Sequence, residues 1–257
     1  MTNTRNLGRR FRDLTIAVCS IVGVWSLYIS VATVPEFLLP TPQSVGLALW
    51  QLVASGDIWA HLSATLSVVL IGLGAGVALG MVFGTILAHF DKLRAWLDGL
   101  LLFLQTAPKI ALAPLFLIWF GLGLLSKVIL VISLVFFPVL IGTILGVRSV
   151  EPSLRDLARI LKLSAWRTLV SIELPQASAD ILAGVRVGSL QAVVGAILAE
   201  WLSSKTGLGY LMIMANATFN APLLFAAVAL TVGVGIVMYF LIESIEMRVL
   251  HWRFSND

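Results

Sequence analysis

The sequence predicts an all-α, polytopic membrane protein of about six transmembrane helices with both termini on the inner side. Of its 257 residues, 59% are hydrophobic and only 12% are charged, whereas soluble domains carry roughly 25% charged residues. Apolar runs recur at lengths near the roughly 20 residues that cross a bilayer core as a helix. The basic residues separate these runs instead of gathering on one solvated face, so nucleic acid is not an expected partner.

Six apolar segments are predicted to span the membrane within a single transmembrane domain, residues 1–257, whose core is about 58–250. Arginines precede the first segment and Ser30-Val31-Ala32 resembles a cleavage site, so a signal peptide is the alternative there. The apolar stretch is longer than that of a usual signal peptide, which favours an uncleaved first helix. The predicted spans are Leu14–Val34, His61–Ala88, Leu97–Phe120, Leu124–Val147, Ile181–Leu202 and Pro222–Leu250.

Polar segments of different character join the spans. Residues 35–57 contain three prolines and then a helix-like stretch, Ser44–Val53, which predicts an outer loop with a short interfacial helix. His89–Arg94 reads as a short inner loop, and Ser203–Ala221 as an outer loop. The longest interruption, Arg148–Gln176, mixes charge with apolar residues as short amphipathic helices outside the bilayer do.

The distribution of Lys and Arg sets the orientation, because these residues concentrate in short loops that stay in the cytoplasm. With the N-terminus inside, the inner segments hold 13 of the 17 basic residues, while the outer loops hold only Lys127 and Lys205. Lys109 and Arg186 lie within or at the ends of spans. Six spans then return the C-terminus to the inner side, and the chain is expected to lie in a membrane, surrounded by lipid.

Glycines recur every four residues along the second predicted span. Such a stripe of small residues lets another helix approach closely. Packing within one subunit is the favoured interpretation, and an interface between subunits is the alternative. The helix-packing glycines are Gly72, Gly76, Gly80 and Gly84.

Ionisable residues inside spans are costly and therefore candidates for function. Lys109 lies in the third predicted span between Pro108 and Pro114, which loosen the helix. These three residues are the candidate translocation pathway, where the lysine would attract an anionic substrate. The alternative is that Lys109 reaches the headgroups or pairs with an acid. Glu200 and Glu243 lie near span ends, where contact with the interface is favoured.

The sequence contains no pattern typical of catalysis or metal binding. The nearest segment to a P-loop, Gly121–Lys127, lacks the glycine directly before its lysine. The three histidines are far apart, there is one cysteine, and neither a zinc-protease pair nor a hydrolase nucleophile motif occurs. We therefore expect no catalytic residue, no metal and no cofactor in this chain.

The inner interruption resembles the EAA loop of ABC importer permeases, a Glu-Ala-Ala pattern followed by Gly and then by Ile-x-Leu-Pro. Asp156 stands for the usual Glu and Lys162 for the usual Gly, which puts the turn between two short helices in doubt because glycine tolerates φ > 0 and lysine does not. The resemblance implies a coupling helix that docks on a cytoplasmic ATPase. The residues it assigns are Asp156, Leu157, Ala158, Leu161, Lys162, Ser164, Ile172, Leu174 and Pro175.

Further motifs resemble the permease branch for nitrate, sulfonate, taurine and thiamine-precursor uptake. The Pro-Lys-x-Ala-Leu-Ala-Pro form of Pro108–Pro114 is closer to permeases for pyrimidines or other organic nutrients. The resemblance implies a bacterial inner-membrane location, a homodimer, two ATPase subunits that hold the ATP and Mg, and an extracytoplasmic binding protein that delivers substrate. The motifs are Phe37–Pro42, Pro108–Gly123, Phe136–Leu140 and Gly207–Leu211.

Two other classes of membrane protein fit parts of the pattern. An ion-coupled secondary transporter needs internal repeats and unwound helices at the midplane, and no clear repeat is present. A structural scaffold accounts for the glycine stripe but leaves the long inner loop unexplained. The permease interpretation accounts for both features.

Overall fold

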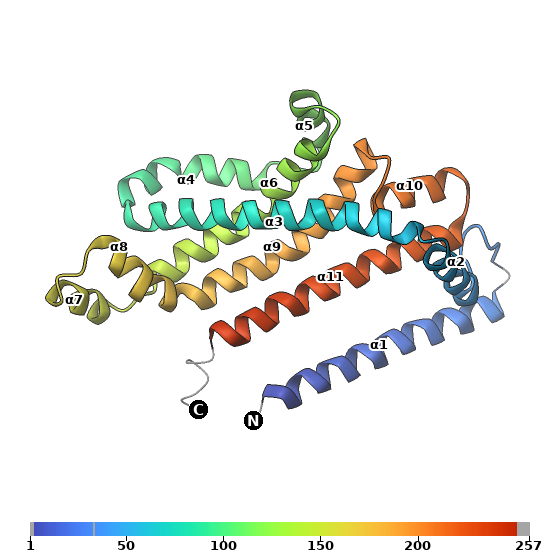
Figure 1. Cartoon of the computed structure of the whole chain (residues 1–257), viewed down its shortest axis with the longest axis horizontal. Coiled ribbons are helices and arrows are strands. Elements are labelled where there is room, and N and C mark those ends of the chain that lie inside the picture. The colour runs from blue at the N-terminus through green and yellow to red at the C-terminus, as the bar shows by residue number, and fades with distance from the viewer. Residues whose placement is uncertain (1–2, 33, 251–257) are drawn as a thin grey trace. The chain divides into compact units, whose positions relative to one another are not determined.

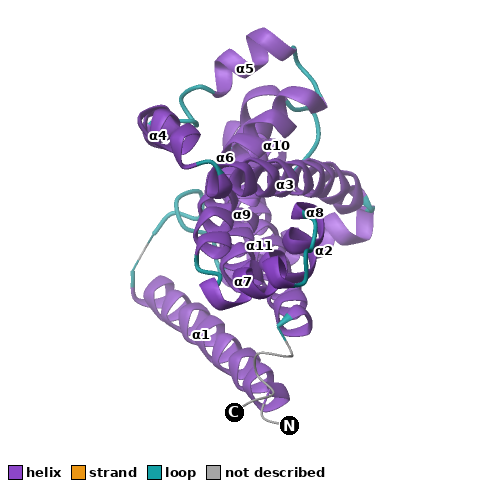
Figure 2. Ribbon diagram, turned by 90° about the vertical axis from the view of Figure 1, so that its left-hand side faces the viewer, coloured by secondary structure: helices purple, strands orange, loops and turns teal. Residues whose placement is uncertain are grey.

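The computed structural model describes residues 3–32 and 34–250, and every regular element within them is a helix (Figures 1 and 2). The prediction of an all-α membrane protein is confirmed. The elements are α1 Asn3–Val31, α2 Pro42–Ser55, α3 Asp57–His89, α4 Asp91–Thr106, α5 Ala113–Phe120, α6 Leu124–Arg148, α7 Pro152–Ile160, α8 Ala165–Thr168, the π-helical turn Leu169–Glu173, α9 Leu174–Ser203, α10 Leu208–Ala217 and α11 Ala221–Val249.

Four helices in the described residues are long and apolar enough to cross a membrane. They are α3, α6, the continuous helix Ala165–Ser203 and α11. The apolar part of α1 is shorter, Thr15–Val31, and the outer loop predicted after α9 contains the short apolar helix α10. The tail from residue 251, predicted to lie inside, falls outside the described residues.

The third predicted span is wrong as a single helix. Helix α4 ends at Thr106, and α5 begins at Ala113 after a turn in which the Ala111 N–H donates to Pro108 O at 2.8 Å. Proline lacks an N–H and pushes the residue before it out of the α-helical region, and Ala107 accordingly has ψ 134°.

The predicted inner loop His89–Arg94 is also shorter than expected. Helix α3 continues through His89, and α4 begins at Asp91. Only Phe90, with φ −111° and ψ 83°, is non-helical. The charged residues of this stretch therefore form the first turn of α4 instead of a loop.

The inner segment matches its prediction only in part. Helix α7 and the short helix α8 form as expected, but no loop separates α8 from the next span. The chain continues through the π-helical turn into α9, with Pro175 in the first turn of α9. The wider turn, in which the Leu174 N–H donates to Leu169 O, absorbs one extra residue just before the proline that has no N–H to donate.

The chain divides into two compact units, each described by itself: residues up to 59 with 211–229, and residues 60–210 with 230 onward. In the first unit, α2 begins after Thr41, whose hydroxyl accepts from the Ser44 N–H at 3.1 Å. The helix buries Val45 and Ala48 beside Ala226. A helix is therefore present where the short interfacial helix is predicted, and it is slightly longer than expected; its place at the interface stays a prediction.

In the second unit, helices α3, α6 and α9 run side by side (Figure 1). The glycine stripe of α3 faces α6 of the same chain. A Cβ on Gly76 would lie 2.7 Å from Val135 Cβ, and one on Gly80 would lie 2.8 Å from Val139 Cβ. Gly72 and Gly84 meet Val131 and Thr143 in the same way.

Helices α6 and α9 approach even more closely, backbone against backbone. A Cβ on Gly142 would lie 2.5 Å from Asp180 O, and one on Gly184 would lie 2.5 Å from Pro138 O. Gly146 has the same relation to Ala177 O, at 2.7 Å. Glycines on both facing surfaces allow the backbones of these two helices to approach this closely.

Candidate functional site

Helix α7, at the inner end of the second unit, is short and exposes apolar side chains. It begins after Glu151 with Pro152 in its first turn, where the missing N–H of proline costs nothing. Ala158 is buried, with 3% of its surface exposed, and faces the rest of the unit. The exposed apolar side chains of this segment, which we call the apolar face, are Leu157, Ile160 and Leu161 of α7 and Trp166 of α8.

The apolar face is exposed although it lies outside the predicted spans. Ile160 is 77% exposed, Leu161 59% and Trp166 71%. Clustered exposed apolar residues rimmed by polar ones mark sites of interaction. Asp156 lies beside this face and forms an exposed ion pair with Arg159 at 3.0 Å.

The turn between α7 and α8 has the hydrogen bonds of a Schellman motif. The Leu163 N–H donates to Ala158 O at 3.0 Å, and the Lys162 N–H donates to Arg159 O at 3.0 Å. Lys162 occupies the left-handed position with φ 52°, which usually belongs to glycine. Ser164 then caps α8 by accepting from the Arg167 N–H at 3.3 Å. The turn between the two short helices therefore forms although a lysine replaces the usual glycine, and Lys162 adopts the strained left-handed conformation.

We expect Lys162→Gly to leave folding intact and to raise the stability of the turn, because glycine avoids the roughly 1–2 kcal/mol cost of a left-handed side-chain-bearing residue. Lys162→Val should lower stability, because a β-branched residue tolerates positive φ poorly. Thermal unfolding of the purified variants in detergent measures both effects. Equal melting temperatures for the two variants would contradict this account of the turn.

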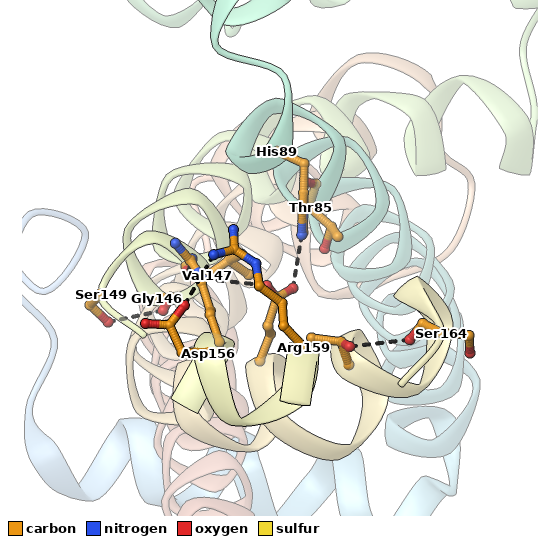
Figure 3. A network of polar contacts seen from close by, with 11 residues as sticks. Thr85, His89, Gly146, Val147, Ser149, Asp156, Arg159 and Ser164 are labelled. Carbon is orange, nitrogen blue, oxygen red and sulfur yellow. Dashed lines mark hydrogen bonds and ion pairs between the residues drawn. The ribbon is translucent and has the colours of Figure 1, made fainter. Parts of the chain in front are cut away.

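A polar network joins this inner loop to the ends of the spans (Figure 3). His89, the last residue of α3, contacts Glu173 Oε2 through Nε2 at 2.9 Å. Arg155 of α7 lies 3.6 Å from the other carboxylate oxygen and donates to Val147 O at 2.7 Å. The sequence analysis missed these three residues. Glu173 is the variable position of the Ile-x-Leu-Pro ending, which offers no signal of its own.

A second ion pair, at the same end of the unit, joins α6 to α4. Arg148, at the end of α6, donates to Asp91 in the first turn of α4 at 2.5 Å. The hydrogen bond and charge of Arg148 lower the pKa of Asp91 below its usual range. The pair is therefore formed above the normal pKa of an aspartate and is lost as pH falls through the lowered pKa.

Comparison with known proteins gives the family. Residues 76–251 match the family described as the binding-protein-dependent transport system inner membrane component. The chain belongs to this family. It is therefore a multi-pass permease of the bacterial inner membrane, the non-catalytic subunit of an ABC importer whose ATPase is a separate chain and whose substrate comes from a binding protein.

Individual relatives align over nearly the whole permease. It is 33% identical to the riboflavin transport system permease protein of Chloroflexus aurantiacus, over 94% of this chain and 90% of the relative. It is 31% identical to a putative aliphatic sulfonates transport permease of Bacillus subtilis, over 92% and 86%. The formylaminopyrimidine transport permease of Halalkalibacterium halodurans is 29% identical, over 93% and 95%.

A solved structure shows the same fold. The match is to an inward-facing form of the MetNI methionine ABC transporter, with a TM-score of 0.66 and 16% identity, over 78% of this permease and 96% of that chain. The predicted membership in the ABC permease family is confirmed, and the ion-coupled transporter and the scaffold are set aside.

The predicted coupling residues occupy two places in the permease. Those on α7 and its turn lie together, with Asp156, Leu157 and Leu161 exposed and Ala158 buried. Ile172 and Leu174 are half-buried in and after the π-helical turn, and Pro175 is exposed. A charge at Ala158 would thus disturb the packing of α7. Substitutions at the exposed residues test contact with a partner better, because they leave this packing intact.

The candidate pathway residues lie at the break between α4 and α5. Pro108 and Pro114 flank the turn, and Lys109 Nζ donates to Gln105 O at 2.8 Å. The same ammonium group lies 4.7 Å from the centroid of the Phe137 ring. A carbonyl oxygen and an aromatic face therefore satisfy this lysine, and a role in the pathway stays a prediction.

Glu200 is buried, which corrects its expected contact with the interface. It is 1% exposed and accepts from the Thr65 hydroxyl at 2.8 Å and from the Gly209 N–H at 2.8 Å. Thr65 in turn accepts from the Leu208 N–H. Glu243 is likewise 7% exposed. The Glu200 carboxylate ties α3 and α9 to the start of α10, inside the Gly207–Leu211 motif.

We expect Glu200→Ala to destabilise the permease strongly, because each lost hydrogen bond to a charged group costs roughly 1.5–3 kcal/mol and the Thr65 and Gly209 donors stay buried. Glu200→Gln keeps an acceptor oxygen and should cost less. Thermal unfolding in detergent distinguishes the two. Wild-type stability of the alanine variant would contradict the anchoring role of this side chain.

Proposed function

We propose that two copies of this permease form the translocation pathway of an ABC importer and that the apolar face of α7 and α8 docks on its ATPase. The exposure of Leu157, Ile160, Leu161 and Trp166 on an inner segment is the observation that carries the proposal. Apolar side chains at the centre of interfaces carry much of the binding energy, and tryptophan is prominent among them. The arginines around this face keep the segment on the inner side.

A second copy of the permease is supported by α4, which buries none of its residues within the chain. Leu102 is 63% exposed and Phe103 68%. In a membrane such a surface contacts either lipid or another protein helix. Native mass spectrometry of the complex in detergent should give two permease copies and two ATPase subunits, and one permease copy would contradict the dimer.

The proposed substrate is a small organic nutrient of the pyrimidine type, with ATP and Mg held by the partner ATPase. The Pro108–Pro114 motif supports this class over sulfonates, and one relative is named for formylaminopyrimidine transport. Other relatives are named for riboflavin and for aliphatic sulfonates. Specificity is expected to rest largely with the binding protein.

Uptake into proteoliposomes tests this function. The permease is reconstituted with its ATPase and binding protein, and labelled formylaminopyrimidine, riboflavin and taurine are compared. We expect accumulation of the pyrimidine that requires ATP and the binding protein and that persists when ion gradients are collapsed. Preference for taurine would contradict the substrate class, and uptake without ATP would contradict the mechanism.

A further inference from the structure

The break between α4 and α5 lies near the middle of the membrane-spanning part of the second unit. Helix α4 ends at Thr106, and α5 begins at Ala113 and turns away from the direction of α4 (Figure 1). The Lys109 ammonium lies 4.7 Å from the ring centroid of Phe137. Phe137 follows the start of α6 by 13 residues and precedes its end by 11. Since α6 is long and apolar enough to cross a membrane, the break lies at the depth of the hydrocarbon core.

Several main-chain polar groups at the break find no hydrogen-bond partner among the described residues. One cause is Pro108, which has no N–H to donate to Leu104 O. Another is the turn itself. The Ala111 N–H, which a continuous helix would direct to Ala107 O, donates to the proline carbonyl at 2.8 Å instead. The unpaired groups are the N–H groups of Lys109 and Ile110 and the carbonyls of Leu104, Thr106 and Ala107.

The helices of this chain leave the break uncovered. Pro108, Ile110 and Ala111 are all exposed, and the isoleucine is 53% exposed. An unpaired N–H or carbonyl is costly in hydrocarbon, so non-helical backbone occurs at membrane depth only where protein buries it or where it lines a water-filled cavity. The break is therefore either in contact with water or covered by a second chain.

The Lys109 side chain is already engaged within the break. Its ammonium donates to Gln105 O at 2.8 Å, the carbonyl that the Lys109 N–H would reach in a continuous helix. It also lies against the Phe137 ring. The lysine side chain thus replaces one lost backbone hydrogen bond. The groups left to contact a ligand are the unpaired main-chain N–H and carbonyl groups.

We propose that the break lines a water-filled translocation pathway and that its unpaired main-chain groups form a hydrogen-bonding site for the passing substrate. The proposal rests on the proposed function, in which two permease copies form that pathway. Water satisfies these groups when no substrate is present. A site whose hydrogen bonds water can replace binds weakly, as transport of a substrate that must leave again requires.

The site fits a ligand that carries donors and acceptors on one polar edge. The Lys109 and Ile110 N–H groups pair with acceptors such as ring nitrogens, and the nearby carbonyls pair with donors such as amino groups. An aminopyrimidine offers both kinds of group beside each other. A sulfonate has only acceptor oxygens, so it would displace water from the carbonyls without replacing their hydrogen bonds. The ligand class is therefore a neutral heterocycle that carries an amino group.

Cysteine reactivity measures whether water reaches the break. In a Cys19→Ser background, Ile110→Cys is placed in lipid nanodiscs and treated with a charged, water-soluble methanethiosulfonate. Only the thiolate reacts, and an apolar environment disfavours it. Leu70→Cys is the matched control, because Leu70 is similarly exposed, at 55%, within the uninterrupted helix α3. We expect Ile110→Cys to react at least about tenfold faster than this control.

Equally slow reaction at both positions would overturn the water-filled site, since lipid or a second copy would then cover the break. Ala111→Cys, at the next exposed position, takes the place of Ile110→Cys if that variant does not fold. The measurement needs neither ATPase nor binding protein. Fast reaction in a permease without ATP-driven uptake would support the water-filled break and contradict the proposed function.

The same variant reports the class of ligand. Formylaminopyrimidine is expected to slow the modification of Ile110→Cys, and taurine is expected to leave the rate unchanged. The reason is that the pyrimidine pairs with both kinds of main-chain group, whereas the sulfonate end of taurine only accepts. Protection by taurine alone, or by neither compound, would overturn the assigned ligand class.

Pro108→Ala tests whether the break itself is needed. The alanine returns the N–H that Leu104 O lacks, so α4 can continue and pair its free groups. We expect ATP-driven uptake to be lost while the thermal unfolding temperature stays the same or rises. Pro42→Ala is the control, because Pro42 lies in the first turn of α2, where a missing N–H leaves no carbonyl unpaired. Wild-type uptake by Pro108→Ala, or a fall in its unfolding temperature together with the loss of uptake, would overturn the role of the break.

Discussion

Gly184→Leu is expected to abolish the folded permease. At Gly184 a Cβ alone would lie 2.5 Å from Pro138 O and 3.1 Å from Val139 Cα. Both atoms belong to the backbone of α6, so the leucine can fit only if α6 and α9 separate. Overpacking usually costs about 1–3 kcal/mol, and here it falls on a contact between two backbones, which no side-chain rotation can relieve.

Fluorescence-detected size exclusion of the tagged protein in detergent measures the effect. We expect the monodisperse peak of the wild type to vanish for Gly184→Leu and to weaken for Gly184→Ala. Gly74→Leu is the control, since no atom lies within 4 Å of a Cβ placed there. A normal peak for Gly184→Leu would show that the α6–α9 contact is not essential for the fold.

Leu161→Asp combined with Trp166→Asp is expected to lower ATP-driven uptake at least about tenfold, since truncation of a hot-spot residue at an interface costs about 2 kcal/mol or more and tryptophan is enriched among hot spots. Both side chains are exposed, at 59% and 71%, so folding should be unaffected. Charge on this apolar face would oppose the docking of the ATPase.

Uptake and size exclusion are measured together for this pair. Gln176→Asp is the control, because it adds a negative charge at an exposed position in the first turn of α9, outside the apolar face. Unchanged uptake with the double variant would remove the apolar face from the coupling surface. Loss of the folded peak would show instead that these residues stabilise the loop itself.

Hydropathy predicted most of the fold because lipid imposes one simple condition on a spanning helix, a sufficient apolar length. Spans such as Leu124–Val147 agree with the observed helices within a residue or two. Prolines were harder to interpret. Pro108 breaks its span, Pro138 lies inside α6, and Pro175 sits in a continuous helix. Whether a proline breaks a helix depends on whether the backbone carbonyl groups that lose their N–H donor find other hydrogen-bond donors.

The part of the candidate site that lies in one segment of the sequence was predictable. The part formed by residues far apart in the sequence was not. The inner loop from Asp156 to Ser164 follows from its charge pattern and family motif. The contact between His89 and Glu173 joins residues that are 84 positions apart, and no local pattern relates them. The α6 and α9 glycines were likewise missed, since their partner is a backbone that the sequence does not place.

The docking of the inner loop on an ATPase is the central claim, and cysteine cross-linking tests it most directly. Cys19 is the single cysteine, so Cys19→Ser gives a cysteine-free background. Leu161→Cys and, as the outer control, Phe219→Cys, which is 81% exposed, are then treated with a short bifunctional reagent in membranes containing the complete transporter. We predict a permease–ATPase product from Leu161→Cys only; no product there, or equal products from both positions, would contradict the account.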